Sequence, residues 1–376
     1  MRPDLREQHA KLAALLQERG PRITEIAREM GESPETVRYW FKHNILGRRG
    51  VVYQAWPDHE RLGFKRIRAV IDFSDEYLPH AKEILIAMNR LCYLSYYLRL
   101  FPSGYYSILL TVPSDGERYY EQLLRDLQEI GILRLLQLDH LDWVRIAPMK
   151  AQYFDFSEGR WDFDWSAAVN EKKKVRPATT SSGGAVKYDY EDLLILEELQ
   201  VDATQSLGDI SRELKMPYPQ VYNHYNHIAE RGQILLYRIL WPATGPRSQE
   251  QMKGWQQHHA HLGLEFLVRN STESEHRELL TKMERLPFMW SCGAGRGNFL
   301  SEFFIPLEYY SETFQYLSEA LVKSRGRTEF YIGDQANALS FTIPTQLYDK
   351  EADAWVVNAD DTLARFKNLV LKVAGK

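Results

Sequence analysis

The sequence predicts an α+β protein in which one two-part unit occurs twice in tandem. Each half opens with a helix-turn-helix-like stretch, over 22–40 in the first half and 206–224 in the second. After each stretch the apolar residues change from helical spacing to alternation, which is the spacing of a strand. We therefore expect two winged helix-turn-helix domains and two ferredoxin-like βαββαβ domains, in alternating order along the chain.

Three short helices with tight turns are expected at the start of each half. In the first half Ser33 is placed to cap the third helix and Pro34 stands in its first turn, while Pro217 and Pro219 mark the same point in the second half. The apolar stripes that predict these helices are Leu12, Leu15 and Leu16, then Ile23, Ile26, Ala27 and Met30, then Val37, Trp40 and Phe41, and in the second half Leu193, Leu196 and Leu199, then Leu207, Ile210 and Leu214, then Val221, Tyr225 and Ile228.

The next part of each half reads as strand, helix, two strands, helix and strand. The first strand is expected to be buried on one face only, because apolar and mixed residues alternate along it: Ile67, Ala69, Ile71 and Phe73 against Arg66, Arg68, Val70 and Asp72. The later elements are a helix with Ile84, Leu85, Met88 and Leu91, two strands flanking the turn at 102–104, a helix with Tyr120, Leu123, Leu127 and Ile130, and a strand over about 135–146. The second half repeats this order with Leu264, Phe266 and Val268, then Leu279, Leu280, Met283 and Leu286, the turn at 295–297, then Phe314, Leu317 and Leu321, and a strand near Phe330. Helices would cover one face of each sheet, and the other copy is a candidate partner for the second face.

These elements divide the 376 residues into four domains and a linker. The predicted segments are a helix-turn-helix domain at 1–62, a sandwich domain at 63–165, a basic and then small, flexible linker at 166–187, a second helix-turn-helix domain at 188–245, and a second sandwich domain with a C-terminal helix at 246–376.

Composition narrows the class of protein. Hydrophobic residues make up 44% and charged residues 26%, as in globular domains with apolar cores. The net charge of −4 means that any contact with nucleic acid must come from local patches. No run of about eighteen apolar residues and no signal-peptide pattern is visible, so we expect a cytoplasmic, nucleoid-associated protein with no membrane partner. Cys92 and Cys292 are expected in equivalent strands as buried or half-buried thiols.

The order of these elements resembles the Lrp/AsnC family of bacterial and archaeal feast/famine regulators, whose sandwich domain is the RAM or AsnC-type domain. The second half carries 188–206, which is similar to the family's first helix and turn. The first half matches at Ile26-Ala27, over 33–37 and at Leu62-Gly63, and its turn within 101–110 resembles the family's glycine turn. Ser107 and Ser301 stand where the family usually has an acidic residue, and the tandem duplication departs from the usual single-copy, often archaeal, member.

The resemblance implies a regulator that binds double-stranded DNA, with sandwich domains that pair, associate into oligomers and hold a small-molecule effector. In such readers the third helix enters the major groove, where side chains near its start contact bases and basic groups contact phosphates. The candidate DNA-binding residues are Ser33, Glu35, Thr36, Arg38, Tyr39, Lys42, His43, Arg48 and Arg49 in the first copy, and Gln220, Tyr222, Asn223, His224 and His227 in the second.

The two copies differ in charge. Residues 1–50 hold ten basic and seven acidic side chains, whereas residues 188–240 hold four basic and nine acidic ones. The third helix of the second copy has no Lys or Arg before Arg231, so it has few groups that could neutralise phosphates. We therefore expect the first helix-turn-helix to be the main DNA reader.

Other functions stay open. One is a chromatin-organising protein with little sequence preference. Another is an enzyme, because siroheme decarboxylases look like fused Lrp/AsnC-type units and use His and Arg between their sandwich domains, although the sequence shows no such His–Arg cluster. No nucleophile with its base, and no metal-ligand set, is visible, so we expect no enzyme, no cofactor and no metal. The cluster of His258, His259 and His261 is more typical of a solvated surface than of a metal or proton site, and 292–297 more typical of a hairpin turn than of a phosphate loop.

Overall fold

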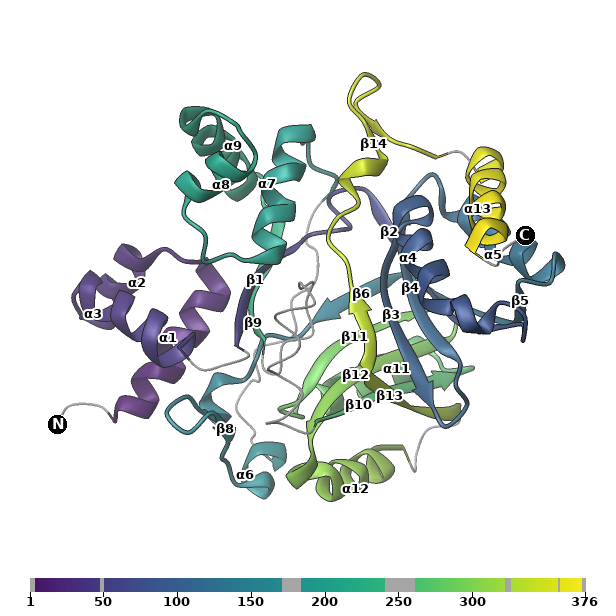
Figure 1. Cartoon of the computed structure of the whole chain (residues 1–376). Helices are drawn as coiled ribbons and strands as arrows, with labels where there is room; N and C mark the ends of the chain where they lie inside the picture. The colour runs from purple at the N-terminus through teal and green to yellow at the C-terminus, as the bar shows by residue number, and fades with distance from the viewer. Residues whose placement is uncertain are drawn as a thin grey trace.

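The computed structural model describes residues 4–47, 51–170, 184–240, 261–321, 326–357 and 359–373. The two helix-turn-helix units lie on one side of the molecule and the two sandwich domains on the other (Figure 1). The predicted residues Arg48 and Arg49, the linker lysines 172–174 and the histidines 258–259 lie outside the described residues. No helix in the described part of the chain is long and apolar enough to cross a membrane.

Each half opens with three helices, as expected. They are α1 (Leu5–Arg19), α2 (Ile23–Met30) and α3 (Pro34–Tyr39), and in the second half α7 (Tyr190–Val201), α8 (Leu207–Glu213) and α9 (Tyr218–Glu230). A π-helical turn over Trp40–Ile45 extends α3. The Ser33 hydroxyl caps α3 by accepting from the amide of Thr36, whereas Pro217, at the start of α9, has no side chain that can cap.

The predicted wings form an antiparallel ribbon that joins the two halves. Strand β1 (Val52–Pro57) pairs with β9 (Ile234–Leu240), while α1 packs against β9 and α7 against β1. The pairing is symmetric, because Tyr53 faces Ile239 while its counterpart Tyr237 faces Ala55, and the two tyrosine rings stack at 5.6 Å. Gly20 allows this contact, since a Cβ there would lie 2.5 Å from the ring of Tyr237. A pseudo-twofold axis therefore passes through the ribbon.

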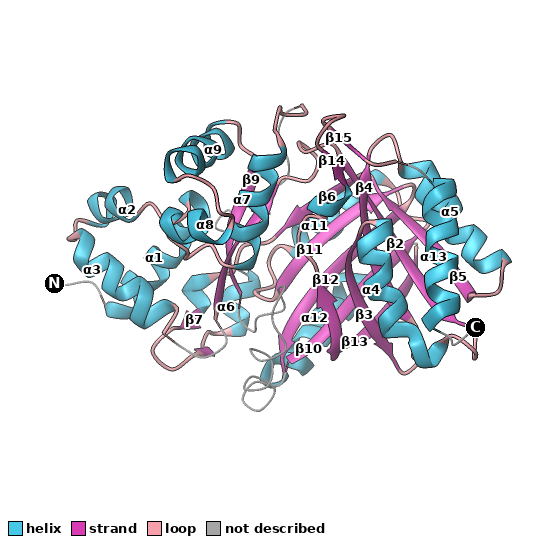
Figure 2. Ribbon diagram, turned by 45° about the horizontal axis from the view of Figure 1, so that its top comes forward, coloured by secondary structure: helices cyan, strands magenta, loops and turns pink. Residues whose placement is uncertain are grey.

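Both sandwich domains have the predicted ferredoxin-like topology (Figure 2). The first consists of β2 (Phe64–Phe73), α4 (Ala81–Cys92), β3 (Leu94–Phe101), β4 (Tyr106–Pro113), α5 (Glu117–Glu129) and β5 (Leu133–Leu141), with the strand order β5-β2-β4-β3. The second consists of β10 (His261–Arg269), α11 (Glu273–Met283), β11 (Met289–Gly295), β12 (Asn298–Pro306), α12 (Tyr310–Leu321) and β13 (Arg327–Ser340), with the order β13-β10-β12-β11.

The two sheets join along both edges. Strand β3 pairs with β13, and β6 (Trp143–Ile146), which continues β5 after Asp142, pairs with β11. The nine strands therefore curve around a shared interior. This corrects the expectation for the first strand: both of its faces are buried, and Arg68 on its polar face is only 1% exposed.

The segments after each sandwich domain pack against the other half. Hairpin β7–β8 (Phe154–Asp155 and Arg160–Trp161) and α6 (Trp165–Asn170) follow the first domain, and hairpin β14–β15 (Tyr348–Asp349 and Ala354–Trp355) and α13 (Ala359–Val373) follow the second. The ring of Phe163 stacks on Tyr309 at 4.6 Å, while Trp355 contacts Phe64 and α13 lies on α4 and α5 (Figure 1). Helix α6 shows that the predicted linker begins after the helix rather than at 166.

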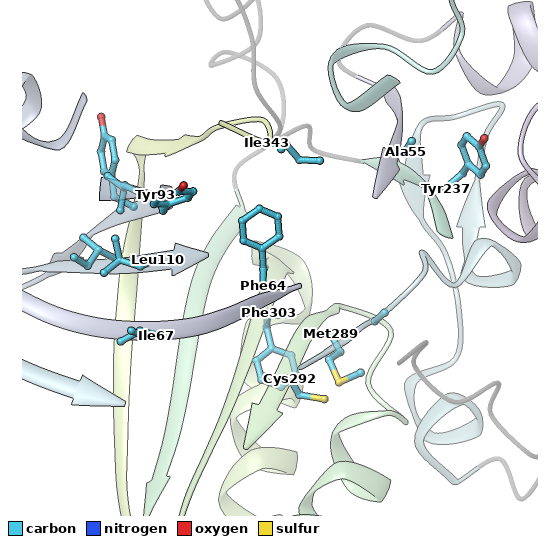
Figure 3. Packing of buried hydrophobic residues seen from close by; sticks show 14 of the residues in the cluster. Ala55, Phe64, Ile67, Tyr93, Leu110, Tyr237, Met289, Cys292, Phe303 and Ile343 are labelled. Carbon is cyan, nitrogen blue, oxygen red and sulfur yellow. The ribbon is translucent and has the colours of Figure 1, made fainter. Parts of the chain in front are cut away.

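One contiguous apolar cluster runs through both halves. Ile67 and Leu110 of the first sandwich domain, Cys292 and Phe303 of the second, and Tyr237 of the ribbon all belong to it (Figure 3). Cys92 and Cys292 are buried free thiols, as expected. Their predicted places in equivalent strands were wrong, however, because Cys92 is the last residue of α4 and only Cys292 lies in a strand.

Candidate functional site

The first candidate surface is the outer face of α3 and its π-helical turn. Val37, Phe41 and Ile45 are buried against the other helices, which turns the intervening side chains outward. Of the predicted residues, Ser33, Glu35, Arg38, Tyr39, Lys42 and His43 are exposed and Thr36 is half-buried. Arg38 and Lys42 form no ion pair with any described residue. The face therefore presents two free cations beside the rings of Tyr39 and His43, which lie 4.7 Å apart.

The corresponding face of α9 is polar but carries no cation. Gln220, Tyr222 and Asn223 are exposed, as the sequence predicted, and Tyr222 lies beside Tyr218. His224 and His227 instead face α7 and are half-buried, with His224 Nδ1 at 2.8 Å from Asp192 Oδ1. Sequence reasoning assigned these two histidines to the reading face because it could not see how the helix turns toward α7.

A second candidate site is a cavity where the β1–β9 ribbon meets the strands of both sandwich domains. It has a volume of about 90 Å³, and it shares His59 and Arg66 with a neighbouring cavity of about 180 Å³. The latter shares Glu60 and Asp142 with a surface groove of about 660 Å³. The 90 Å³ cavity is lined by residues of β1 to β6 and of β9 to β13, so no single stretch of sequence contains it.

Two guanidinium groups at this cavity have no carboxylate in hydrogen-bonding contact among the described residues. Arg66 lines the cavity, and Arg238 lies against Trp56 and Trp290, which line it. Arg238 lies between the rings of Trp56 and Trp290, with centroids at 5.1 and 3.5 Å from its Cζ atom. Its Nη2 donates to the carbonyls of Ala147 and Trp290, whereas its buried Nη1 has no partner among the described residues. Burial lowers the pKa of Arg238 to about 9. A buried cation of this kind is stabilised by an incoming anion.

Arg66 provides the second cation. It donates from Nη2 to Nδ1 of His59 at 2.8 Å. Burial lowers the pKa of Arg66 to about 10. Burial, and then the charge of Arg66, hold the pKa of His59 well below its usual value, so the ring is neutral and its proton sits on Nε2. The sequence showed no His–Arg cluster, and the fold brings His59 and Arg66 together with Arg238 nearby.

The deeper part of the interior is charge-paired. Arg68 donates to Asp139 at 2.8 Å and to Glu265, and Arg269 donates to the other oxygen of Asp139 at 2.6 Å. Burial opposes the charge on Arg68, but these carboxylates outweigh it and raise the pKa of Arg68. Glu302 differs, because burial and the charge of Glu265 raise the pKa of Glu302 to about 7. The cavity thus holds an acid that titrates near neutral pH.

The sequence contained one signal of this site. Arg66 and Arg68 lie on the polar face of a strand whose sheet was expected to pair with a second sheet. When the two sheets pair, the polar face of this strand lines the interior, and its arginines need hydrogen-bonding partners there. The contributions of Trp56, Arg238 and Trp290 could not be predicted, because they depend on how the ribbon sits over the strands.

Comparisons with known proteins agree with the fold. No protein-family model matches the chain, and no curated protein matches it. The solved structure of the siroheme decarboxylase NirDL is similar over 97% of this chain and 99% of its own, with a TM-score of 0.55 and 11% identity. NirDL in co-complex with an iron-uroporphyrin III analogue gives a TM-score of 0.51 at 10% identity, over 96% and 98% of the two chains. E. coli AsnC is 14% identical over 39% of this chain and 92% of its own, with a TM-score of 0.27. The likeness to NirDL shows that the tandem fold, with two winged helix-turn-helix and two ferredoxin-like domains, extends along nearly the whole chain.

Proposed function

We propose that this protein is a DNA-binding transcription regulator of Lrp/AsnC type whose first helix-turn-helix is the main reader. The observation that carries the proposal is the exposed face of α3, where Arg38 and Lys42 have no ion-pair partner among the described residues. Free cations on a recognition helix neutralise phosphates and release counterions, and Arg also reads guanine. The sandwich domains pair within one chain, and association of whole chains stays a prediction.

The test is a DNA titration of the variant Arg38→Ala/Lys42→Ala. Affinity for every DNA should fall, and the slope of log K against log salt should become shallower by about 1.8 if both side chains neutralise a phosphate. Lys82→Ala/Arg90→Ala is the matched control, since it removes the same two charges from the exposed face of α4. Unchanged affinity of the Arg38/Lys42 variant would refute the assignment of this helix.

Sequence preference separates a regulator from a chromatin-organising protein. Affinity for promoter fragments is compared with affinity for random DNA at one fixed salt concentration, because the phosphate contribution is common to both. A regulator should favour particular fragments by at least about 10³-fold. Mapping bound sites across the genome would then show the spacing of half-sites.

The interior cavity favours a second function, binding of a planar carboxylate-bearing ligand. Arg66 and Arg238 suit carboxylates, and Trp56 and Trp290 already hold a flat group between them. Because NirDL was solved with an iron-uroporphyrin III analogue, an iron tetrapyrrole is the ligand class to test. A cavity of about 90 Å³ is too small for a macrocycle, so the cavity would have to widen to admit one.

This second function is tested with iron-uroporphyrin III and the purified protein. A shifted absorbance spectrum that saturates at one equivalent, and is weakened in Arg238→Gln, supports binding. Loss of a carboxyl group from the bound compound, followed by mass spectrometry, would make the protein an enzyme. Binding without turnover would make the compound an effector, and no binding would leave the DNA-binding proposal intact.

A further inference from the structure

Three potential metal ligands converge inside the second helix-turn-helix unit. Asp192 comes from α7, and His224 and His227 come from α9, with one ligand atom of each lying within 4.8 Å of the others. The two histidines are three residues apart and so share one face of the helix. The cluster lies on the side of α9 that faces α7, away from Gln220, Tyr222 and Asn223.

The surroundings orient the carboxylate toward the histidines. Asp192 is fully buried, and its Oδ2 accepts from Gln233 Nε2 at 3.1 Å and lies 3.6 Å from Arg231 Nη1. Its Oδ1 is therefore the oxygen that faces His224 Nδ1, at 2.8 Å. Outer partners of this kind are what fix a ligating carboxylate in metal sites.

A second, independent observation comes from His227. Its Nδ1 is buried and has no hydrogen-bond partner among the described residues. A buried imidazole nitrogen without a partner is costly. Coordination to a cation would satisfy this nitrogen, and the carboxylate of Asp192 supplies the charge that a cation requires.

We infer that Asp192, His224 and His227 form a binding site for a divalent transition ion of the zinc class. Imidazole and carboxylate ligands suit zinc, which binds them at about 2.0–2.2 Å. The hydrogen bond between His224 and Asp192 must therefore open to admit the ion, while the wider separations in the cluster close. Asp189, whose Oδ1 lies 3.4 Å from His224 Nδ1, adds a second negative charge beside the cluster. Two carboxylates and two neutral imidazoles would balance a dication, and any proton on the ligating nitrogens would leave on binding.

The first repeat shows what the chain looks like without the site. In the register that aligns Val37 with Val221, Gln8, Trp40 and His43 stand at the positions of Asp192, His224 and His227. Gln8 offers no charge and Trp40 no ligand. The ion would therefore bind one reader only, joining its first helix to its recognition helix. The inference does not depend on DNA binding by either unit.

The experiment is a zinc titration of the full-length protein, freed of metal by a chelator, against a chromophoric competitor. We expect about one tight equivalent. In His227→Gln the affinity should fall by more than about 100-fold, beyond the loss typical of an outer partner. His43→Gln is the matched control and should bind zinc as the unaltered protein does. The histidines at 258, 259 and 261 are common to all three proteins, so the difference reports on this cluster alone.

Circular dichroism shows whether each variant is folded. His227→Gln is preferred to a change of Asp192, because Asp192 also supports Gln233. A second measurement uses Co²⁺ in place of zinc: the visible bands of a nitrogen-ligated site should appear in the unaltered protein and in His43→Gln, and be absent in His227→Gln. Equal zinc affinity in the unaltered protein and His227→Gln, or an equal loss in His43→Gln, would overturn the inference.

Discussion

The two helix-turn-helix units have the same scaffold and different surfaces. Their helices and wing strands align without a gap, from Val37 in α3 and Val221 in α9 to Tyr53 and Tyr237 in the ribbon. Yet α3 exposes Arg38 and Lys42 where α9 has Tyr222 and Asn226. The apolar core is what both copies must keep in order to fold, whereas charges on the outer face are free to diverge once the copies are fused. A homodimer cannot make this distinction, because both of its readers have one sequence.

Equivalent positions of the two copies also differ in charge where the two sandwich domains meet. Arg68 and Glu265 occupy equivalent positions of β2 and β10 and pair directly across the interior. In a homodimer a residue near the twofold axis faces its own copy, so an arginine there would meet an arginine. Fusion allows opposite charges at the two positions. It also allows the neutral Gln54 to stand opposite Arg238 in the ribbon, at another pair of equivalent positions.

The largest expected effect tests this interior pair. Arg68→Leu leaves Glu265, and part of the charge of Asp139, without a partner in a buried environment, so the free energy of unfolding should fall by about 3–5 kcal/mol. Urea denaturation followed by circular dichroism measures it. Arg68→Leu/Glu265→Leu should recover part of the loss, because it removes both charges. A loss below about 1 kcal/mol, the size typical of an exposed pair, would contradict the interior placement.

The second prediction concerns Glu302, whose counterpart in the first sandwich domain is Leu109. Its pKa of about 7 in the folded protein is above the usual value, so between these two pKa values the folded state holds a proton that the unfolded state has lost. The stability that the folded state gains from protonated Glu302 is therefore fully present at low pH, and it is lost as the pH rises through about 7. Relative to Glu302→Gln, the protein should lose about 2–3 kcal/mol of unfolding free energy between about pH 5 and about pH 8.

Leu109→Gln is the control for this second prediction, since it introduces the same amide at the equivalent position of the other domain. Its difference from the unaltered protein should not change with pH. A difference for Glu302→Gln that is equally flat across the range would show that Glu302 is ionised in both states.

These interior features mark the limit of what the sequence predicts. Periodicity located the helices and strands of both halves, because the core stripes around Ile26 and Ile210 depend on spacing along the chain. It predicted a strand buried on one face only, because alternation along one strand does not show how closely a partner covers the face that carries Arg68. It placed His224 on the reading surface for a similar reason. Both errors concern contacts between distant segments, and the cavity around Arg238 is made of nothing else.

The third prediction exchanges the reading faces. Arg38→Tyr/Lys42→Asn gives the first reader the residues of the second, and Tyr222→Arg/Asn226→Lys does the reverse. If both units lie against DNA, the second variant should steepen the slope of log K against log salt by up to about 1.8, and the first should make it shallower by as much. Because of this difference in slope, the ratio of the variant's DNA affinity to that of the unaltered protein should change roughly tenfold between about 50 and 200 mM salt.

Reading these two variants together separates the roles of the two units. Higher DNA affinity in Tyr222→Arg/Asn226→Lys means that the second unit lies close to DNA and lacks only positive charge. If that variant binds DNA no more tightly, while Arg38→Tyr/Lys42→Asn binds it more weakly, the second unit does not face the DNA. Equal DNA affinity in the two variants and the unaltered protein would show that neither α3 nor α9 lies on the DNA-binding surface.

The smallest effect concerns the starts of the two recognition helices. Ser33 caps α3, and Pro217 stands at the same position before α9 without a side-chain cap. Ser33→Ala should lower the free energy of unfolding by about 1 kcal/mol. Pro217→Ser should change it by far less, because the gain of a cap is offset by about 0.4–1 kcal/mol through the greater freedom of the unfolded chain without proline. Urea denaturation of both variants gives the comparison. A net change near zero in Pro217→Ser means that proline rigidity stabilises the second helix about as strongly as the hydroxyl stabilises the first, so that the two copies reach the same local stability by different physical means. A loss as large as that of Ser33→Ala would contradict this equivalence, because proline would then stabilise its helix more than a cap does.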